Sequence, residues 1–276
     1  MPDLPRSCPF QRKEFPLPAR LWYMQYDPIS KAFGLEVRDH DRLQTSFLSL
    51  SLEKAEISSE ITVSQELWMV QLKDLVGDFL VVQQYTEAEV PRWQSLWLLN
   101  PYVPEASSES RVYLGEYRYA GRVADRLIVA DSADKLYSIE ISSERIEPGF
   151  ISVEEDVSRD QSTDFEKLRY KKISFPEFEK EPSFLQLNTS VAGKFHPHFD
   201  VLELEPGRGF VSAYPVEDSA TEGLSHFLYW WDNDKNLLEQ VARLGNGLSG
   251  FAIDPIWAVG RNVLATTDRN LLILLQ

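Results

Sequence analysis

The chain of 276 residues carries a formal net charge of −15, and 43% of its residues are hydrophobic. A chain of this length buries enough apolar surface to need no covalent staples, and Cys8, its single cysteine, excludes an intrachain disulfide. The acidic balance argues against nucleic acid and anionic membranes as partners, because both attract basic surfaces.

Residues 1–18 form a proline-rich N-terminal segment, with Pro2, Pro5, Pro9, Pro16 and Pro18. The segment lacks the apolar stretch of a secretory signal peptide. No apolar run in the chain reaches the ~20 residues that cross a bilayer. We therefore expect a cytoplasmic protein with a single domain over residues 19–276.

An internal repeat begins directly after the proline-rich segment. Residues 21–25 (LWYMQ) match residues 67–71 (LWMVQ), and at the same offset of 46 residues Phe33 falls opposite Phe79. Trp22 and Trp68 occupy matched positions of this repeat. We expect both indole rings to pack in the core between neighbouring repeats.

Five segments share a pattern of turn-forming or charged residues, then a β-rich run, then a turn and a second run. The pairs of runs are 31–37 with 45–52, 77–82 with 94–99, 125–130 with 135–141, 208–213 with 226–231, and 261–266 with 271–275. Polar clusters between apolar runs are typical of hairpin loops. The sequence therefore predicts five β-hairpins.

Hairpins that recur every ~40–50 residues predict an all-β, β-propeller-like fold, in which each blade covers the apolar faces of its neighbours. We expect the N-terminal strand, residues 21–26, to close the ring with the last blade. Residues 142–167 form an acidic excursion. Five blades are favoured, and six is the alternative, with residues 169–175 and 184–187 in a degenerate blade.

Helix is scarce in the predicted fold. Residues 234–244 fit a helix with Asp234 as N-cap and Gly245 after its end, and they also alternate acceptably as a strand. We favour the strand, because a blade needs an outer strand at this point.

The residues Trp22, Glu36-Val37-Arg38-Asp39 and Phe47, followed by Trp68, Tyr85 and Pro91, resemble a bacterial family that is defined only as a domain of unknown function. The resemblance implies a single-domain bacterial protein over most of the chain. It implies no activity, so no catalytic residue is carried over from it.

Charged residues cluster where the first hairpin turns. Glu36 and Arg38 share one face of a strand, because alternate residues of a strand point the same way, and His40 follows them. They could line a binding pocket, but structural ion pairing is the favoured interpretation. The second candidate surface is the long loop 86–93 with Tyr85, Arg92 and Trp93, since long loops often carry function.

Further candidate residues are a pair of tryptophans, a histidine cluster and a glycine-rich string. Adjacent Trp230 and Trp231 must face opposite sides of a strand, one packing between blades and the other more exposed. His196, His198 and Asp200 could ligate a transition metal, and a plain surface loop is the favoured alternative. Residues 245–250 spell GxGxxG, which we interpret as a turn between blades because Pro255 stops any following helix.

These patterns favour a binding or scaffold module for an unknown protein or small-molecule partner. The alternative is a metal-assisted hydrolase or lyase with its site at the propeller channel. We expect no cofactor, since the sequence contains no P-loop, HExxH or GxSxG motif.

Overall fold

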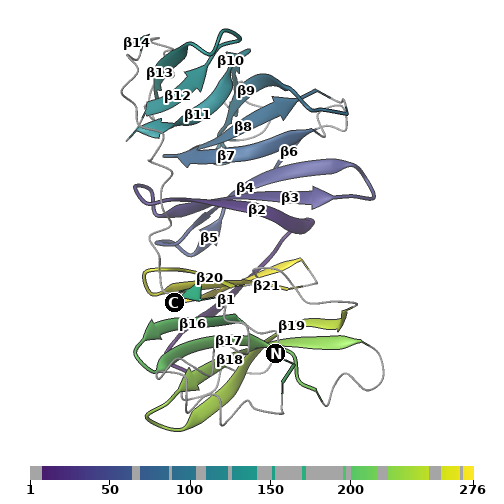
Figure 1. Ribbon diagram of the computed structural model, residues 1–276, viewed down its shortest axis with the longest axis vertical. Helices are drawn as coiled ribbons and strands as arrows, with labels where there is room; N and C mark the ends of the chain where they lie inside the picture. Colours follow the sequence, from purple (N-terminus) through teal and green to yellow (C-terminus); the bar gives the residue numbers. More distant parts are fainter. Residues whose placement is uncertain are drawn as a thin grey trace. The chain divides into compact units, whose positions relative to one another are not determined.

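The computed structural model describes residues 8–63, 69–86, 89–103, 110–123, 126–141, 151–152, 170–171, 195–196, 200–216, 223–248, 256–267 and 270–276. In this part of the chain every helix or strand is a β-strand, which confirms the all-β prediction (Figure 1). None of these residues belongs to a helix that could cross a membrane. The chain divides into two compact units, Met1–Leu17 with Glu166–Gln276 (unit 1) and Pro18–Phe165 (unit 2).

The described residues of unit 2 form three antiparallel sheets. Sheet 1 has the order β2-β3-β4-β5, with β6 also paired to β4, sheet 2 has the order β7-β8-β9-β10, and sheet 3 has the order β11-β12-β13-β14. Their strands are β2 (Arg20–Asp27), β3 (Ala32–Asp39), β4 (Gln44–Ser51), β5 (Glu56–Ile57), β6 (Ile61–Val63), β7 (Val70–Val76), β8 (Phe79–Tyr85), β9 (Trp93–Leu99), β10 (Arg111–Gly115), β11 (Arg118–Val123), β12 (Arg126–Ala130), β13 (Leu136–Glu140) and β14 (Ile151–Ser152).

Over the part of unit 1 that the structure describes, the strands form two antiparallel sheets. Sheet 4 has the order β15-β16-β17-β18-β19, and sheet 5 has the order β20-β21-β22-β1. Their strands are β1 (Arg12–Pro16), β15 (Tyr170–Lys171), β16 (Asp200–Glu205), β17 (Arg208–Ala213), β18 (Leu224–Asp232), β19 (Leu237–Leu248), β20 (Ile256–Val259), β21 (Asn262–Thr266) and β22 (Leu271–Leu275).

Each of the five predicted hairpins is the central strand pair of a different sheet. The pairs are β3–β4, β8–β9, β12–β13, β17–β18 and β21–β22. Such meandering sheets are the building blocks of propeller blades, so the fold is β-propeller-like. The single domain over residues 19–276, the number of blades and the closure of a ring stay predictions.

Two strand predictions have different outcomes. The strand that joins the last sheet is β1, which pairs with β22 from Arg12↔Leu275 to Pro16↔Leu271. The predicted residues 21–26 instead lie in β2 and pair with β3, so that assignment was wrong. The strand prediction for residues 234–244 is confirmed from Leu237 onward, because β19 begins there.

Proline density explains why β1 was missed. Pro16 is the last residue of an edge strand, where a missing N–H costs no ladder hydrogen bond. Beyond β1, the main chains of Gln11 and Gln276 donate N–H groups to each other's carbonyl oxygens, at 2.7 and 3.0 Å. The proline-rich segment therefore contains an ordered strand.

The hydrophobic core of unit 2 lies between its sheets. Phe47 of sheet 1 packs with Leu72 and Leu80 of sheet 2. At Gly34 of β3 the sheets approach so closely that an added Cβ would lie 2.7 Å from Cδ2 of Leu80. Sheets 2 and 3 share a second cluster that includes Leu98 and Val129.

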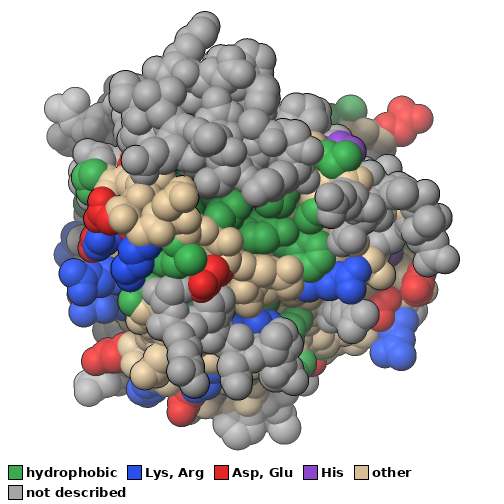
Figure 2. Space-filling model, turned by 90° about the horizontal axis from the view of Figure 1, so that it is seen from below, with side chains coloured by type: hydrophobic (Ala, Val, Ile, Leu, Met, Phe, Trp, Pro, Cys, Tyr) green, Lys and Arg blue, Asp and Glu red, His purple; other side chains and the backbone are tan. Residues whose placement is uncertain are grey.

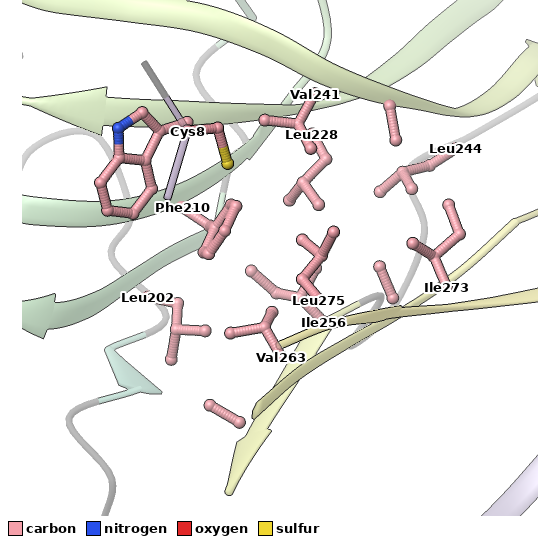
Figure 3. Packing of buried hydrophobic residues seen from close by; sticks show 14 residues of the cluster. Cys8, Leu202, Phe210, Leu228, Val241, Leu244, Ile256, Val263, Ile273 and Leu275 are labelled. Carbon is pink, nitrogen blue, oxygen red and sulfur yellow. The ribbon is translucent and has the colours of Figure 1, made fainter. Parts of the chain in front are cut away.

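In unit 1 the main core joins sheets 4 and 5. Figure 3 shows Phe210 and Leu228 of sheet 4 facing Val263 and Leu275 of sheet 5, with Cys8 beside them. Burial raises the pKa of the Cys8 thiol.

The opposite face of sheet 4 is also apolar. Trp230 belongs to the core with sheet 5, whereas Trp231 packs with Val211 on the other face, which confirms that the two rings point to opposite sides. Both indole rings are buried, so the expected exposure of one of them was wrong. Figure 2 shows one face of the molecule, where hydrophobic side chains gather near the middle and charged side chains lie around them.

Several sequence predictions fall outside the described residues. They concern Trp68, the acidic excursion 142–167 apart from β14, and the degenerate blade apart from β15. In the GxGxxG string, Gly245–Leu248 continues strand β19, so the predicted turn was wrong over those residues. Gly250 lies outside the described residues.

Candidate functional site

Glu36 and Arg38 tie sheet 1 to sheet 2. The Glu36 side chain is fully buried and accepts a hydrogen bond from Arg38 Nε at 2.7 Å and another from the Leu72 N–H at 2.8 Å. Arg38 Nη2 donates to the Val70 carbonyl oxygen at 2.7 Å. Burial raises the pKa of Glu36, and the Arg38 guanidinium opposes that rise.

Gln83 makes the equivalent bridge between sheets 2 and 3. Glu36 and Gln83 are each the fifth residue of the second strand in their sheet. The Gln83 Oε1 accepts the Tyr119 N–H at 2.8 Å, and its Nε2 donates to the carbonyl oxygens of Ser95 and Tyr117. The N–H groups of Leu72 and Tyr119, which these side chains accept, each lie directly before a bulge in the first strand of the next sheet. Both N–H groups belong to edge strands, β7 and β11, so in each case a polar side chain of the preceding sheet supplies an acceptor at a sheet edge.

Trp22 lies on the surface beside the Glu36–Arg38 pair, so its predicted position in the core was wrong. Its side chain is 53% exposed. The register of β2 with β3 shifts between Leu21 and Tyr23, so Trp22 sits in a bulge and leaves the inward-outward alternation. The Arg38 guanidinium carbon lies 4.9 Å from the centre of the indole ring, and the His40 ring lies 5.4 Å from it.

Tyr23 extends the exposed aromatic surface along β2. Its side chain is 40% exposed, lies opposite Glu36 in the strand register, and donates its hydroxyl to Gln25 Oε1 at 3.2 Å. Burial and the charges of Asp74 and Glu36 raise the pKa of Tyr23. We define the aromatic platform as Trp22, Tyr23 and His40.

The second group of predicted residues lies on sheet 2. Tyr85 pairs with Trp93 in the strand register, its hydroxyl lies 3.5 Å from Gln71 Oε1, and Lys73 Nζ lies 5.3 Å from its ring centre. The exposed Arg92 accepts the Thr86 main-chain N–H at its carbonyl oxygen and donates its own N–H to the Thr86 hydroxyl oxygen, which closes the base of the predicted long loop.

The two groups of predicted residues meet at the start of β7. Arg38 donates to the carbonyl oxygen of Val70, and the Tyr85 N–H donates to the carbonyl oxygen of Met69 at 2.8 Å. The structure thus places Glu36, Arg38 and His40 on one flank of this strand end, and Tyr85 and Trp93 on the other.

A second buried polar cluster connects all three sheets of unit 2, and the sequence interpretation missed it. Arg122 Nη1 lies 2.9 Å from Asp27 Oδ1 and 3.8 Å from Asp74 Oδ1, and Tyr119 donates its hydroxyl to Asp74 Oδ2 at 2.7 Å. Burial acts to raise the pKa of Asp27, but hydrogen bonds from Ser30 and the Arg122 charge bring it below its ordinary value. The pKa of Asp74 is raised, mainly by burial.

The predicted histidine cluster is described in part. His196 donates its main-chain N–H to the Tyr214 carbonyl oxygen, Asp200 is buried at the start of β16, and His198 lies outside the described residues. Over the described ranges, no three His, Cys, Asp or Glu side chains are grouped so that they could hold a metal ion.

One further histidine is buried in sheet 4. His226 Nε2 contacts the Ser212 hydroxyl, and its ring stacks on Tyr214 with centres 4.3 Å apart. Burial lowers the pKa of His226 to about 4, so the imidazole is neutral at pH 7. This contact joins β17 to β18 near the ends of both strands.

Fold and site together define an all-β, β-propeller-like protein with an exposed aromatic platform over buried charge pairs. No protein-family model and no curated protein matches the chain. Among solved structures it is similar to the β-propeller domain of the Trilobed protease from Pyrococcus furiosus, which is described as having an open velcro topology. The identity is 12%, the TM-score is 0.32, and the match covers 93% of this chain but 65% of the other.

Proposed function

We propose that this protein is a binding module that holds a protein or small-molecule partner on the aromatic platform. One observation carries the proposal: a half-exposed tryptophan ring is held against a guanidinium that is itself fixed by a fully buried carboxylate. Trp22 is thus presented to solvent from a rigid support.

Pre-organisation is the physical reason for expecting binding there. A flexible surface side chain loses about 0.5–1.5 kcal/mol of conformational freedom when a partner immobilises it. The contacts of Trp22 with Arg38 and His40 restrict the indole before a partner arrives, so less of this cost remains. Trp, Tyr and Arg are also the residue types that most often dominate binding energy at interfaces.

Tyr85, Arg92 and Trp93 complete the proposed surface on the other side of the β7 strand end. Arg92 is exposed and Trp93 is partly exposed, so a partner larger than a single ring could reach them from the platform. The proposed partner is neither nucleic acid nor a membrane, because a net charge of −15 repels both. A cytoplasmic location belongs to the same proposal.

Fluorine NMR of protein labelled with 5-fluorotryptophan tests the proposal. The chain has seven tryptophans, and the spectrum of the Trp22→Phe variant identifies the Trp22 resonance. Adenosine, N-acetyltyrosinamide and benzoate serve as ring-bearing probes at about 10 mM, where a ligand with a Kd near 1 mM fills most sites. We expect at least one probe to shift the Trp22 resonance, with saturation, and to leave the buried Trp231 resonance in place.

The matched control is Tyr113→Ala. Tyr113 is an exposed aromatic residue of the same unit, 52% exposed, and packs on Trp97 instead of the platform. Probe binding, measured in both variants by calorimetry because Trp22→Ala has no Trp22 resonance, should survive Tyr113→Ala and be lost in Trp22→Ala. If no probe shifts the Trp22 resonance, or if both variants lose binding equally, the platform is not a binding site.

A further inference from the structure

Two arginines stand directly opposite each other at the edge of the aromatic platform. Arg20 pairs with Arg38 in the antiparallel register of β2 and β3. Like charges at directly opposed positions are destabilising, and the chain has 43 acidic residues against 28 basic ones. In a chain with more acidic than basic residues, a position opposite an arginine would be expected to hold an acidic residue and not a second arginine.

The charges around the platform are compensated unequally. Arg38 is matched by the buried Glu36, and Arg42 lies 3.6 Å from Asp39. Arg20 is exposed, and no ion pair or hydrogen bond of its guanidinium occurs among the described residues. Arg20 is two residues from Trp22 on β2, and it lies opposite the arginine that contacts the Trp22 ring.

We propose that the aromatic platform binds an anionic ligand that carries a planar ring, with the ring on Trp22 and the anionic group at Arg20. The inference rests on the proposed binding function and names its ligand class. Stacking of a ring on an aromatic side chain requires no charge, whereas a guanidinium recognises carboxylate and phosphate oxygens through paired N–H donors. The two contacts can therefore be tested separately.

Matched pairs of small probes separate the ring from the charge. AMP and adenosine share a ring and differ by a phosphate, and benzoate and benzamide share a ring and differ by a carboxylate. Ribose 5-phosphate supplies the phosphate without the ring. The Kd of each probe is measured from the shift of the Trp22 fluorine resonance, or by calorimetry for ribose 5-phosphate.

We expect each anionic ring to bind about tenfold more tightly than its neutral counterpart, which is the effect of one charge-assisted hydrogen bond. Arg20→Gln should abolish this difference while leaving the neutral rings unchanged. The matched control is Arg126→Gln, which removes an exposed arginine of sheet 3 that is paired with Glu140. Binding of only one anionic ring would assign the ligand to the phosphate or to the carboxylate class.

Three outcomes overturn the inference. One is equal affinity for charged and neutral rings, which leaves the platform as a binding site for neutral ligands. Another is an equal loss in Arg20→Gln and Arg126→Gln, which reflects net charge alone. The third is binding of ribose 5-phosphate as tight as that of AMP, which excludes the ring contact. If instead no ring probe shifts the Trp22 resonance, the proposed function itself fails.

Discussion

Replacement of Glu36 tests the bridge between sheets 1 and 2. In Glu36→Ala the Leu72 N–H loses its acceptor, and the Arg38 guanidinium, which is 13% exposed, loses its carboxylate. A buried N–H without a partner costs about 1–3 kcal/mol, and breaking a buried ion pair costs about 3–5 kcal/mol. Because the two losses overlap, we expect Glu36→Ala to lower the free energy of unfolding by about 3–5 kcal/mol.

Glu36→Gln is the matched variant, because Gln83 performs the same bridging role one sheet further on. The amide oxygen can still accept the Leu72 N–H, and an amide is less costly to bury than a carboxylate. Arg38 and Leu72 donate to different oxygens of Glu36, so the amide NH2 then faces the Arg38 guanidinium and that hydrogen bond is lost. We expect a loss of about 1.5–3 kcal/mol. Urea titrations followed by circular dichroism give both free energies, and hydrogen exchange reports the Leu72 amide directly.

A double-mutant cycle with Arg38→Ala separates the ion pair from the N–H bridge. Residues in one buried network are expected to show a coupling of about 0.5–3 kcal/mol. The reasoning is refuted if Glu36→Ala costs less than about 1 kcal/mol, the range of ordinary surface substitutions, or if alanine and glutamine cost the same.

Three further predictions follow from burial and close approach. Trp231→Ala should lower the free energy of unfolding by about 3–5 kcal/mol, because Trp231 is only 1% exposed. Trp22→Ala should lower it by less than about 1 kcal/mol, because Trp22 is 53% exposed, and equal losses in urea titrations would contradict this contrast. The pKa of His226 is lowered from 6.5 to about 4, so the unfolded chain takes up the proton first as the pH falls. The contribution of His226 to the free energy of unfolding, about 3 kcal/mol, should therefore be complete above pH 6.5 and lost towards pH 4. A His226→Gln variant with the same pH profile of stability as the wild type would disprove this. Gly209→Ala would place a Cβ 2.0 Å from a carbonyl oxygen of β16 and should lower the free energy of unfolding by at least about 3 kcal/mol. Gly260 has a φ of 57° and open space around it, so Gly260→Ala should cost only about 1–2 kcal/mol. In thermal melts Gly209→Ala should therefore unfold at the lower temperature.

The hairpins were predictable because their determinants are local. Residues 131–134 form a polar turn between two apolar runs, and the structure has β12 and β13 on either side of it. The same reasoning recovered the central strands of all five sheets. The edge strands were harder, since β1 is short, lies in a proline-rich segment and pairs with a strand at the other end of the chain.

The candidate site could be predicted only in part. The sequence placed Glu36 and Arg38 on one strand face, but the bridge to Leu72 depends on the edge strand of a different sheet. A signal was present: Glu36 is the one acidic residue between Ala32 and Val37, and a lone charge in an apolar run indicates a buried partner. The exposure of Trp22 had no such signal, because a bulge is invisible to a repeat alignment.

The pairing of β1 with β22 has a consequence for the order of folding during synthesis. Sheet 5 needs Arg12–Pro16 and Leu271–Leu275 together, and contacts between such distant residues form slowly because a long loop must close first. Residues 18–165 are continuous in the sequence and have their own core, so unit 2 can fold while the ribosome is still making the remainder. Until β22 is synthesised, the N–H and C=O groups that β1 uses in this pairing have no strand partner, and unpaired strand edges favour aggregation.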